Sequence, residues 1–139
     1  MSLVVRQAEP ADADAIFAFW TSLDEADRSF QCSPGHLHPR RDQLDEWLEP
    51  GSDKSIAVAE QDGVIVCTEI FIPSTAQSFW TNVIPEKFAT VYPAVCRQAS
   101  AWSGKGIWGW SGIAASAAMH VAIGWEEDPE TGMLAWVGS

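Results

Sequence analysis

The stretch from Ser78 to Trp102 combines a strand pattern, a loop and a helix pattern, an order in which many proteins bind phosphate groups. Ser78 to Ile84 is rich in β-branched and aromatic residues and stops at Pro85, which predicts a strand. Pro93 suits the first position of a helix that continues to Trp102. Loops at such junctions usually contain glycine, which lets the backbone approach the ligand, and this loop has none.

Glu69 is a second candidate for chemistry, because it lies within the strand pattern of residues 64–72. On a strand it shares a face with Ile65, Cys67 and Phe71. A carboxylate that is buried on an apolar face has a raised pKa and can exchange protons near neutral pH. The alternative interpretation is a structural glutamate that faces an edge or is held by hydrogen bonds.

Cys32, His36 and His38 have the residue types of a zinc site. Their Cys-x-x-x-His-x-His spacing matches no strong zinc signature, and the stretch contains the turn signal Ser33-Pro34-Gly35. We therefore predict no metal site in this chain. The alternative to a metal site is a set of solvated loop side chains.

The composition indicates a globular protein with a strongly acidic surface. The chain of 139 residues has 8 basic and 19 acidic residues and a formal net charge of −11. Such a surface repels nucleic acids and anionic membranes, and Arg40-Arg41 is too small a basic patch to reverse this. The three cysteines show no paired spacing, and the N-terminus has no signal-peptide pattern. We expect a cytoplasmic protein that binds neither nucleic acid nor membrane.

The remaining patterns predict one α/β domain that spans residues 1–139. In chain order they predict strand 3–7, helices 11–23 and 39–48, strands 55–60 and 64–72 with a turn at Asp62-Gly63, the strand and helix described above, strand 106–111, helix 113–123, and strands 125–128 and 133–137. The order is β-α-α-β-β-β-α-β-α-β-β. A hairpin followed by strands that are linked through helices implies a mixed sheet flanked by helices.

Four short segments in this order resemble the GNAT (Gcn5-related N-acetyltransferase) superfamily. Residues 5–13 are similar to its opening strand and helix turn, and residues 57–66 to its second and third strands. Val83-Ile84-Pro85-Glu86 resembles the end of its fourth strand, and residues 122–125 resemble the segment after its last helix. The resemblance implies a GNAT-like mixed sheet. It also implies an activity that transfers an acetyl group from acetyl-CoA to an amine.

The chain departs from the superfamily in the loop that binds the coenzyme A pyrophosphate. GNAT enzymes carry Gln/Arg-x-x-Gly-x-Gly/Ala there, and this chain has Phe88, Val91 and Pro93 at the three defined positions. Phe88 offers no hydrogen bond, Val91 places a branched side chain near the phosphate, and Pro93 lacks an N–H donor. Conventional coenzyme A binding should be badly weakened, although pantetheine contacts can remain. The resemblance assigns cofactor contact to Val83, Phe88, Ala89, Thr90, Val91 and Tyr92.

The resemblance also implies two catalytic positions. The general acid of the superfamily, often a tyrosine in the last helix, falls at His120, whose imidazole can donate a proton near neutral pH. The structural alternative is a helix histidine that packs beside Met119 and Val121 or is exposed. Many GNAT enzymes carry a carboxylate base on the fourth strand, but residues 78–83 contain none, so Glu69 is the candidate base.

Eight tryptophans are many for a chain of this size. In GNAT folds the fourth and fifth strands splay apart and the pantetheine arm enters between them. Trp80, Trp108 and Trp110 belong to those strands, so we expect at least one of the three rings to fill the cleft or cover its mouth. The alternative is that Trp108 and Trp110 lie on the opposite face of the sheet as ordinary core.

Two functions remain open at this point. The first is a GNAT-like domain that has lost normal acetyl-CoA binding, needs no cofactor and serves as a binding or structural protein with a protein partner. The segment Trp108-Gly109-Trp110-Ser111-Gly112 and the brief closing hairpin loosely resemble small internal virion proteins of T7-group tailed phages, which implies association with a virion. We expect this first function, because a fold survives the loss of a ligand loop.

The alternative is an N-acetyltransferase that transfers the acetyl group of acetyl-CoA to a small amine. In GNAT proteins the region between the first two helices often shapes the acceptor site. The resemblance therefore gives Arg28, His36, His38 and Arg40 a possible contact with an acidic substrate or a partner.

Overall fold

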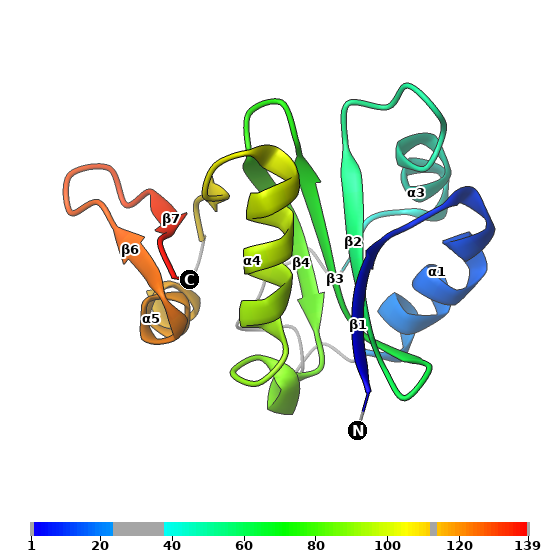
Figure 1. Cartoon of the computed structure of the whole chain (residues 1–139), viewed down its shortest axis with the longest axis horizontal. Coiled ribbons are helices and arrows are strands. Elements are labelled where there is room, and N and C mark those ends of the chain that lie inside the picture. The colour runs from blue at the N-terminus through cyan, green and yellow to red at the C-terminus, as the bar shows by residue number, and fades with distance from the viewer. Residues whose placement is uncertain (1, 24–37, 112–113, 139) are drawn as a thin grey trace.

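The computed structural model describes residues 2–23, 38–111 and 114–138 of the chain (Figure 1). The strands in these residues are β1 (Leu3–Gln7), β2 (Ser55–Gln61), β3 (Val64–Ile72), β4 (Gln77–Val83), β5 (Trp108–Gly109), β6 (Trp125–Glu127) and β7 (Leu134–Trp136). The α-helices are α1 (Ala13–Ser22), α3 (Arg41–Trp47), α4 (Tyr92–Ser103) and α5 (Ala114–Ile123), and two short 3-10 helices are η1 (Pro10–Asp12) and η2 (Pro85–Lys87).

The strands form one mixed sheet in the order β1-β2-β3-β4-β5-β7-β6. Its neighbouring strands are antiparallel except for β4 and β5, which are parallel. β4 and β5 pair at a single position, Gln77 with Trp108, at the start of β4. The two strands therefore diverge beyond that point, and Figure 1 shows the β6–β7 hairpin standing apart from β4.

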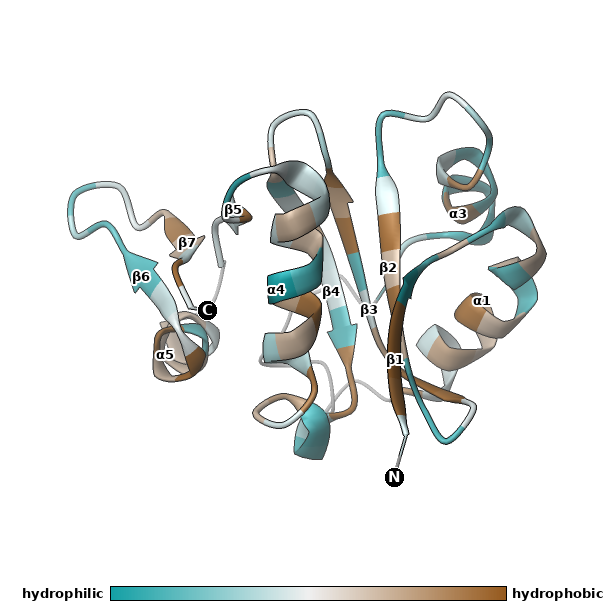
Figure 2. Cartoon of the chain, in the orientation of Figure 1, coloured by the Kyte–Doolittle hydropathy of each residue, from teal (hydrophilic) through white to brown (hydrophobic). Residues whose placement is uncertain are grey.

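Helices cover both faces of the sheet. α4 lies on one face of the β1–β4 part and α1 with α3 on the other, while α5 packs on β6 and β7 (Figure 1). Figure 2 shows strongly apolar residues on β1, β2 and β3 and a mixture of apolar and polar residues along the helices. The buried residues form two clusters, one between α4, α5 and the sheet and one between α1, α3 and the sheet. Among the described residues, no helix is long and apolar enough to cross a membrane.

A β-bulge in β4 decides which side chains face each cluster. Ile70 of β3 pairs with Trp80, while Phe71 pairs with Ser78, so Phe79 is the extra residue of the bulge. Trp80 packs against the α1–α3 cluster, and Phe79 meets Trp47 of α3 edge-to-face. Ser78 can therefore lie opposite Phe71 on the α4 face.

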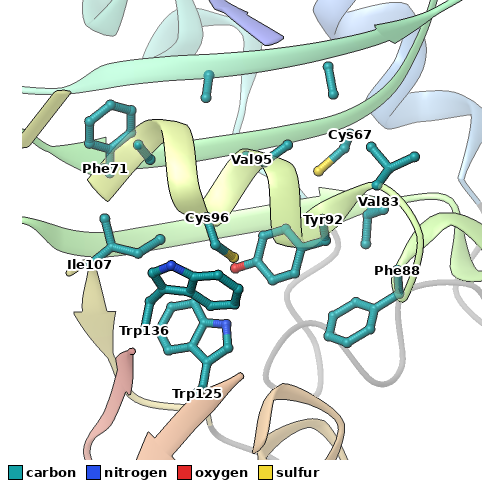
Figure 3. Close-up of a cluster of buried hydrophobic side chains, with 14 of the residues drawn as sticks. Cys67, Phe71, Val83, Phe88, Tyr92, Val95, Cys96, Ile107, Trp125 and Trp136 are labelled. Carbon is teal, nitrogen blue, oxygen red and sulfur yellow. The ribbon is translucent and has the colours of Figure 1, made fainter. Parts of the chain in front are cut away.

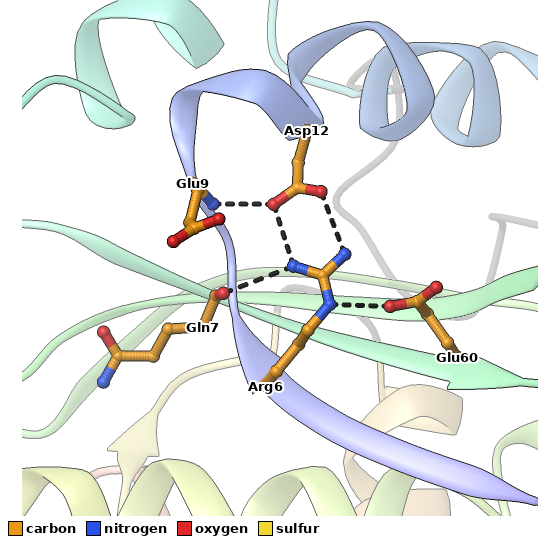
Figure 4. Close-up of polar contacts among 5 residues, drawn as sticks. All are labelled: Arg6, Gln7, Glu9, Asp12 and Glu60. Atoms are coloured by element: carbon orange, nitrogen blue, oxygen red, sulfur yellow. Dashed lines mark hydrogen bonds and ion pairs between the residues drawn. The ribbon is translucent and has the colours of Figure 1, made fainter. Parts of the chain in front are cut away.

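Arg6 ties the edge strand β1 to its neighbours (Figure 4). Its Nε donates to Glu60 Oε1 of β2 at 2.6 Å, and its Nη1 and Nη2 donate to the Asp12 carboxylate at 2.8 and 2.9 Å. Asp12 also accepts a bond from the Glu9 backbone N–H, which fixes the first turn after β1. The hydrogen bonds from Arg6 lower the pKa of Asp12, so this carboxylate stays ionised.

The predicted order of elements and the mixed sheet are confirmed. The turn at Asp62-Gly63 has positive φ at both residues, 53° and 83°, as an Asp-Gly hairpin requires. The predicted strand 106–111 is shorter than expected and spans only Trp108–Gly109. The reason is local: the Ile107 N–H bonds to Ser100 Oγ of α4 instead of to a strand.

Candidate functional site

The loop between β4 and α4 is folded inward. The side chains of Phe88 and Val91 are buried in the cluster under α4, and Val83 at the end of β4 is buried with them. The N–H groups of Phe88 and Val91 donate to the carbonyls of Pro85 and Lys87 at 3.2 and 2.8 Å. Two backbone donors of the loop are thus used within the loop itself.

Not every residue of the expected cofactor segment lies in this inward arrangement. Ala89 and Thr90 are exposed at the tip of the loop, whereas Tyr92 is fully buried at the first position of α4. Pro93 follows at the second position, where it donates no N–H. The segment therefore divides into a buried apolar part and a two-residue exposed tip.

Glu69 is fully buried on β3 and faces α4. Its Oε1 accepts a hydrogen bond from Ser78 Oγ and its Oε2 accepts one from Thr81 Oγ1. The Tyr92 hydroxyl lies 3.4 Å from Oε2. Burial raises the pKa of Glu69 to about 7, although the hydroxyl donors of Ser78, Thr81 and Tyr92 oppose the shift. Glu69 is therefore both buried with a raised pKa and held by hydrogen bonds.

Tyr92 connects the Glu69 network to His120. The Tyr92 ring packs at 5.2 Å from Phe88, at 5.6 Å from His120 and at 6.4 Å from Trp125 (centroid distances). Figure 3 shows the Tyr92 ring lying between α4 and the two indoles of the closing hairpin. Burial raises the pKa of the Tyr92 phenol well above its usual range, so the hydroxyl stays protonated and can donate a hydrogen bond.

His120 lies on α5 among aromatic rings. Its Nδ1 is 2.7 Å from the carbonyl oxygen of Ser116, so Nδ1–H is the donor and Nε2 carries the lone pair. Burial lowers the pKa of His120, and the neutral form is favoured. The rings of Phe88 and Trp125 are each 5.2 Å away, both edge-on. The Nδ1–H is held by the Ser116 carbonyl oxygen. His120 could therefore act as an acid only after its Nε2 had bound a proton.

The tryptophans that fill the space beside Tyr92 are not the three expected from the sequence. Trp125 of β6 and Trp136 of β7 are buried in the cluster under α4, with ring centroids 6.3 Å apart (Figure 3). Trp80 packs on the α1–α3 side instead, and Trp110 is exposed. Trp108 packs against the edge of the α4 cluster. Of the three expected rings, only Trp108 contacts that cluster.

The sequence-predicted site residues thus fall into two groups. The structure brings Glu69, Tyr92, His120, Phe88 and Val91 together under α4, with Val83 beside them. It leaves Ala89 and Thr90 at the surface. Ser78 and Thr81 were not predicted from the sequence, because their contact with Glu69 depends on the strand register and the bulge in β4.

The candidate metal residues cannot be assembled from the described part of the chain. Cys32 and His36 lie outside the described residues, as does Arg28. His38 packs against Phe17 and Trp20, with centroid distances of 5.4 and 6.2 Å. Within the described ranges there is no group of three or more His, Cys, Asp or Glu side chains that could hold a metal ion. Arg40, at the end of the same stretch, is exposed and pairs with Asp42.

The chemistry of the gathered residues is that of a buried proton site. A carboxyl group with a pKa near 7 is linked through hydroxyl groups to a phenol, and the phenol ring touches a neutral imidazole. Such a set can hold and exchange one proton near neutral pH.

Comparison with solved structures identifies the fold. No family model and no curated protein sequence matches this chain. The PaiA N-acetyltransferase from Thermoplasma acidophilum, solved in complex with coenzyme A, superposes with a TM-score of 0.72 over 98% of this chain and 99% of its own, at 11% identity. The GNAT domain of PAT from S. lividans gives a TM-score of 0.70 over 94% of this chain and 86% of that domain, at 10% identity.

A third similar structure is the ribosomal-protein-S18-alanine N-acetyltransferase from Escherichia coli. Its TM-score is 0.60 over 97% of this chain and 93% of the enzyme, at 12% identity. These structures share the architecture of the GNAT superfamily with this chain, which therefore has the GNAT fold. Identities of this size establish the fold alone, and the activity has to be argued from the residues of this chain.

Proposed function

We propose that this chain is a GNAT-fold domain that no longer holds acetyl-CoA as the acetyltransferases do and that acts as a binding or structural protein. The observation that carries the proposal is the burial of Phe88 and Val91 in the loop between β4 and α4. In the GNAT pattern those positions present a polar side chain and a glycine to the pyrophosphate.

The energetics of this loop oppose a pyrophosphate. Turning the backbone of Val91 toward a ligand would break its N–H bond to Lys87 and withdraw its side chain from the core. Exposing a buried Val or Phe side chain costs about 1.5–3 kcal/mol each. Pro93 has no backbone N–H that could donate a hydrogen bond to a phosphate and so offset this cost. Each kcal/mol lost in this way weakens affinity, because 1.4 kcal/mol corresponds to about tenfold in the dissociation constant.

Titration calorimetry with acetyl-CoA in moderate salt tests the proposal directly. The Thermoplasma PaiA enzyme, which was crystallised with coenzyme A, serves as the positive control in the same buffer. We expect heat of binding for the control and none for this chain at matched concentrations. Binding in the micromolar range by this chain would overturn the proposal.

The biological setting that we propose is a tailed-phage virion, in which the domain would contact another virion protein. This rests on the loose similarity of the segment from Trp108 to Ser111 and of the brief closing hairpin to small internal virion proteins of T7-group phages. Mass spectrometry of purified particles from a phage that encodes this chain is the test. We expect the chain to be found in particles at a fixed copy number, and its absence would refute this setting.

An N-acetyltransferase is the second candidate, and the Glu69–Tyr92–His120 arrangement favours it. A carboxyl group with a pKa of about 7 suits a general base near neutral pH, and pantetheine needs fewer contacts than the whole coenzyme. If calorimetry detects acetyl-CoA, release of coenzyme A with amine acceptors should be measured for the wild type and for Glu69→Gln and His120→Ala. Activity that both substitutions abolish would establish this second function.

A further inference from the structure

The C-terminal strands carry an apolar face that no helix of the described chain covers. Leu134 and Trp136 of β7 are buried toward α4 and α5, so Ala135 between them faces the other side. Ala135 pairs with Trp108 of β5 and with Glu126 of β6, which places these residues in one row. Trp108 lies at the edge of the sheet face and also contacts the border of the α4 cluster. We call this surface the tryptophan face. Its members are Trp108, Trp110, Met133, Ala135 and Val137, with Glu126 at its edge.

Part of the tryptophan face is exposed to solvent. Trp110 is 59% exposed and Val137 is 62% exposed, which is high for large apolar side chains. Trp108, Met133 and Ala135 are half-buried. The Trp108 indole donates its Nε1–H to the carbonyl of Thr75 at 2.7 Å, and Trp110 packs edge-to-face on Trp108 with ring centroids 5.4 Å apart. The exposed ring therefore packs against a ring that is held by a hydrogen bond, which lowers the entropic cost of binding.

The same side of the sheet is covered elsewhere. On that side, α1 and α3 cover the β2–β4 part of the sheet (Figure 1). They bury Ile56, Val58 and Ile70. Within the described ranges, neither helix packs substantially on β5, β6 or β7. In the part of the chain that the structure describes, these strands lack the helical layer that the neighbouring strands have, and an amphipathic helix is the element that would complete it.

The charge around the tryptophan face specifies what kind of helix fits. From Trp108 to the C-terminus the sequence has no Lys or Arg but four acidic residues, Glu126, Glu127, Asp128 and Glu130. Glu126 lies directly beside Ala135 on this face. A second copy of this chain is disfavoured as the occupant, because each copy carries a net charge of −11. A helix with an apolar stripe and flanking Lys or Arg residues is complementary to this face, both in its apolar surface and in its charge.

We propose that the tryptophan face docks a basic amphipathic helix of a partner protein, with Trp110 as the main apolar contact. The inference rests on the proposed role as a binding protein and names the surface and the partner chemistry. Exposed tryptophans with an acidic rim suit this partner, since tryptophan contributes strongly at interfaces and charge pairs select the partner.

The test uses the full chain and a synthetic 14-residue helical peptide of Leu and Lys, with the Leu residues on one face. Two control peptides replace every Lys by Glu or every Leu by Ser. The protein variants are Trp110→Ala, Glu126→Gln and the matched control Val64→Ala. Val64 is 63% exposed at the start of β3, where it pairs with Gln61 of β2 next to the Asp62-Gly63 turn, and it is not part of the tryptophan face. We expect micromolar binding of the Leu–Lys peptide by the wild type and by Val64→Ala.

Trp110→Ala should weaken binding about tenfold or more, the effect of removing an interface tryptophan. Glu126→Gln should weaken it less and reduce its salt dependence. Circular dichroism should show Trp110→Ala as folded as the wild type, because the ring is mostly exposed. Equal binding by Trp110→Ala, or binding of the Leu–Glu peptide as tight as that of the Leu–Lys peptide, overturns the inference.

Three further outcomes also overturn it. One is no binding of the Leu–Lys peptide. Another is a wild-type dimer in analytical ultracentrifugation that Trp110→Ala dissociates, which would make a second copy the occupant. The third is binding to phosphatidylcholine vesicles that requires Trp110 while the peptide does not bind. Calorimetry with acetyl-CoA keeps the two proposals apart: acetyl-CoA binding refutes the proposed function, whereas peptide binding through Trp110 still supports the docking face.

Discussion

The hydroxyl of Tyr92 lies 3.4 Å from Oε2 of Glu69, so the first residue of α4 touches a buried carboxyl group on β3. Tyr92 lies between Val91 and Pro93 at the end of the loop from β4 to α4. Its phenol points into the core and approaches Glu69 there. The contact joins the first turn of α4 to the centre of the sheet.

Glu69 should make the protein less stable as the pH rises from about 5 to 8. Its pKa is about 7 in the folded chain, whereas the pKa of an ordinary solvated glutamate is about 4.5, so the folded state binds more protons between these values. The stabilisation is therefore complete below the unfolded pKa and is lost as the pH rises through the folded pKa. The shift corresponds to a change on the order of 3 kcal/mol in the free energy of unfolding.

Glu69→Gln is the control for this pH dependence, because glutamine does not titrate. Urea unfolding of both proteins at several pH values between 5 and 8 measures the difference. His120, whose pKa is lowered, contributes a slope of opposite sign below its unfolded pKa in both proteins, so it cancels in the comparison. Parallel stability curves for wild type and Glu69→Gln would contradict the raised pKa.

Tyr92→Phe should raise the pKa of Glu69 further and lower the stability of the fold by about 1 kcal/mol, the usual net value of one hydrogen bond. The phenol is one of the donors that oppose the effect of burial on Glu69. Carbon NMR of the Glu69 carboxyl measures the pKa in both proteins. Phe71→Leu, a substitution in the same cluster without a polar contact, should leave the Glu69 pKa unchanged. An unchanged Glu69 pKa in Tyr92→Phe would show that the hydroxyl does not act on Glu69.

Much of this architecture could be predicted from periodicity and turn signals. The Asp62-Gly63 hairpin, the strand that ends before Pro85 and the helix that begins at Tyr92-Pro93 are encoded locally. The short β5 was not predictable, because the Ile107 N–H leaves the strand pattern for Ser100 Oγ on another element. The strand pattern does not show that a side chain of the preceding helix takes up this N–H.

The candidate site was predictable in part for the same reason. The inward position of Glu69 follows from strand alternation, since Cys67 and Phe71 are two residues away on either side. Its donors Ser78 and Thr81 depend on the bulge between Ile70 and Phe71, which no pattern in the sequence marks. The indoles beside Tyr92 come from the closing hairpin, whose register sets which tryptophans face inward.

Asn82→Leu should stabilise the fold. Asn82 is fully buried on β4, and among the described residues neither its side-chain nitrogen nor its oxygen has a hydrogen-bond partner. Burying an amide without partners costs about 1–3 kcal/mol, and leucine is similar in size. We expect the midpoint of urea unfolding to rise for Asn82→Leu and to fall for Asn82→Ala, which leaves a cavity. A decrease for both variants would show that the Asn82 amide makes a stabilising contact.

Gly106→Ala should destabilise the junction between β5 and β7. A Cβ at residue 106 would overlap the backbone carbonyl oxygen of Trp136, which cannot move without displacing the Trp136 N–H bond to the Ile107 carbonyl. Overpacking of this kind costs about 1–3 kcal/mol. Gly109→Ala is the matched control, because its Cβ would lie 3.0 Å from the Ser78 carbonyl oxygen, a contact that a small shift relieves. Thermal unfolding should give the lower midpoint for Gly106→Ala. A midpoint equal to that of the wild type would mean that β5 and β7 are not held together as described, and the placement of Trp136 beside Tyr92 would then be wrong as well.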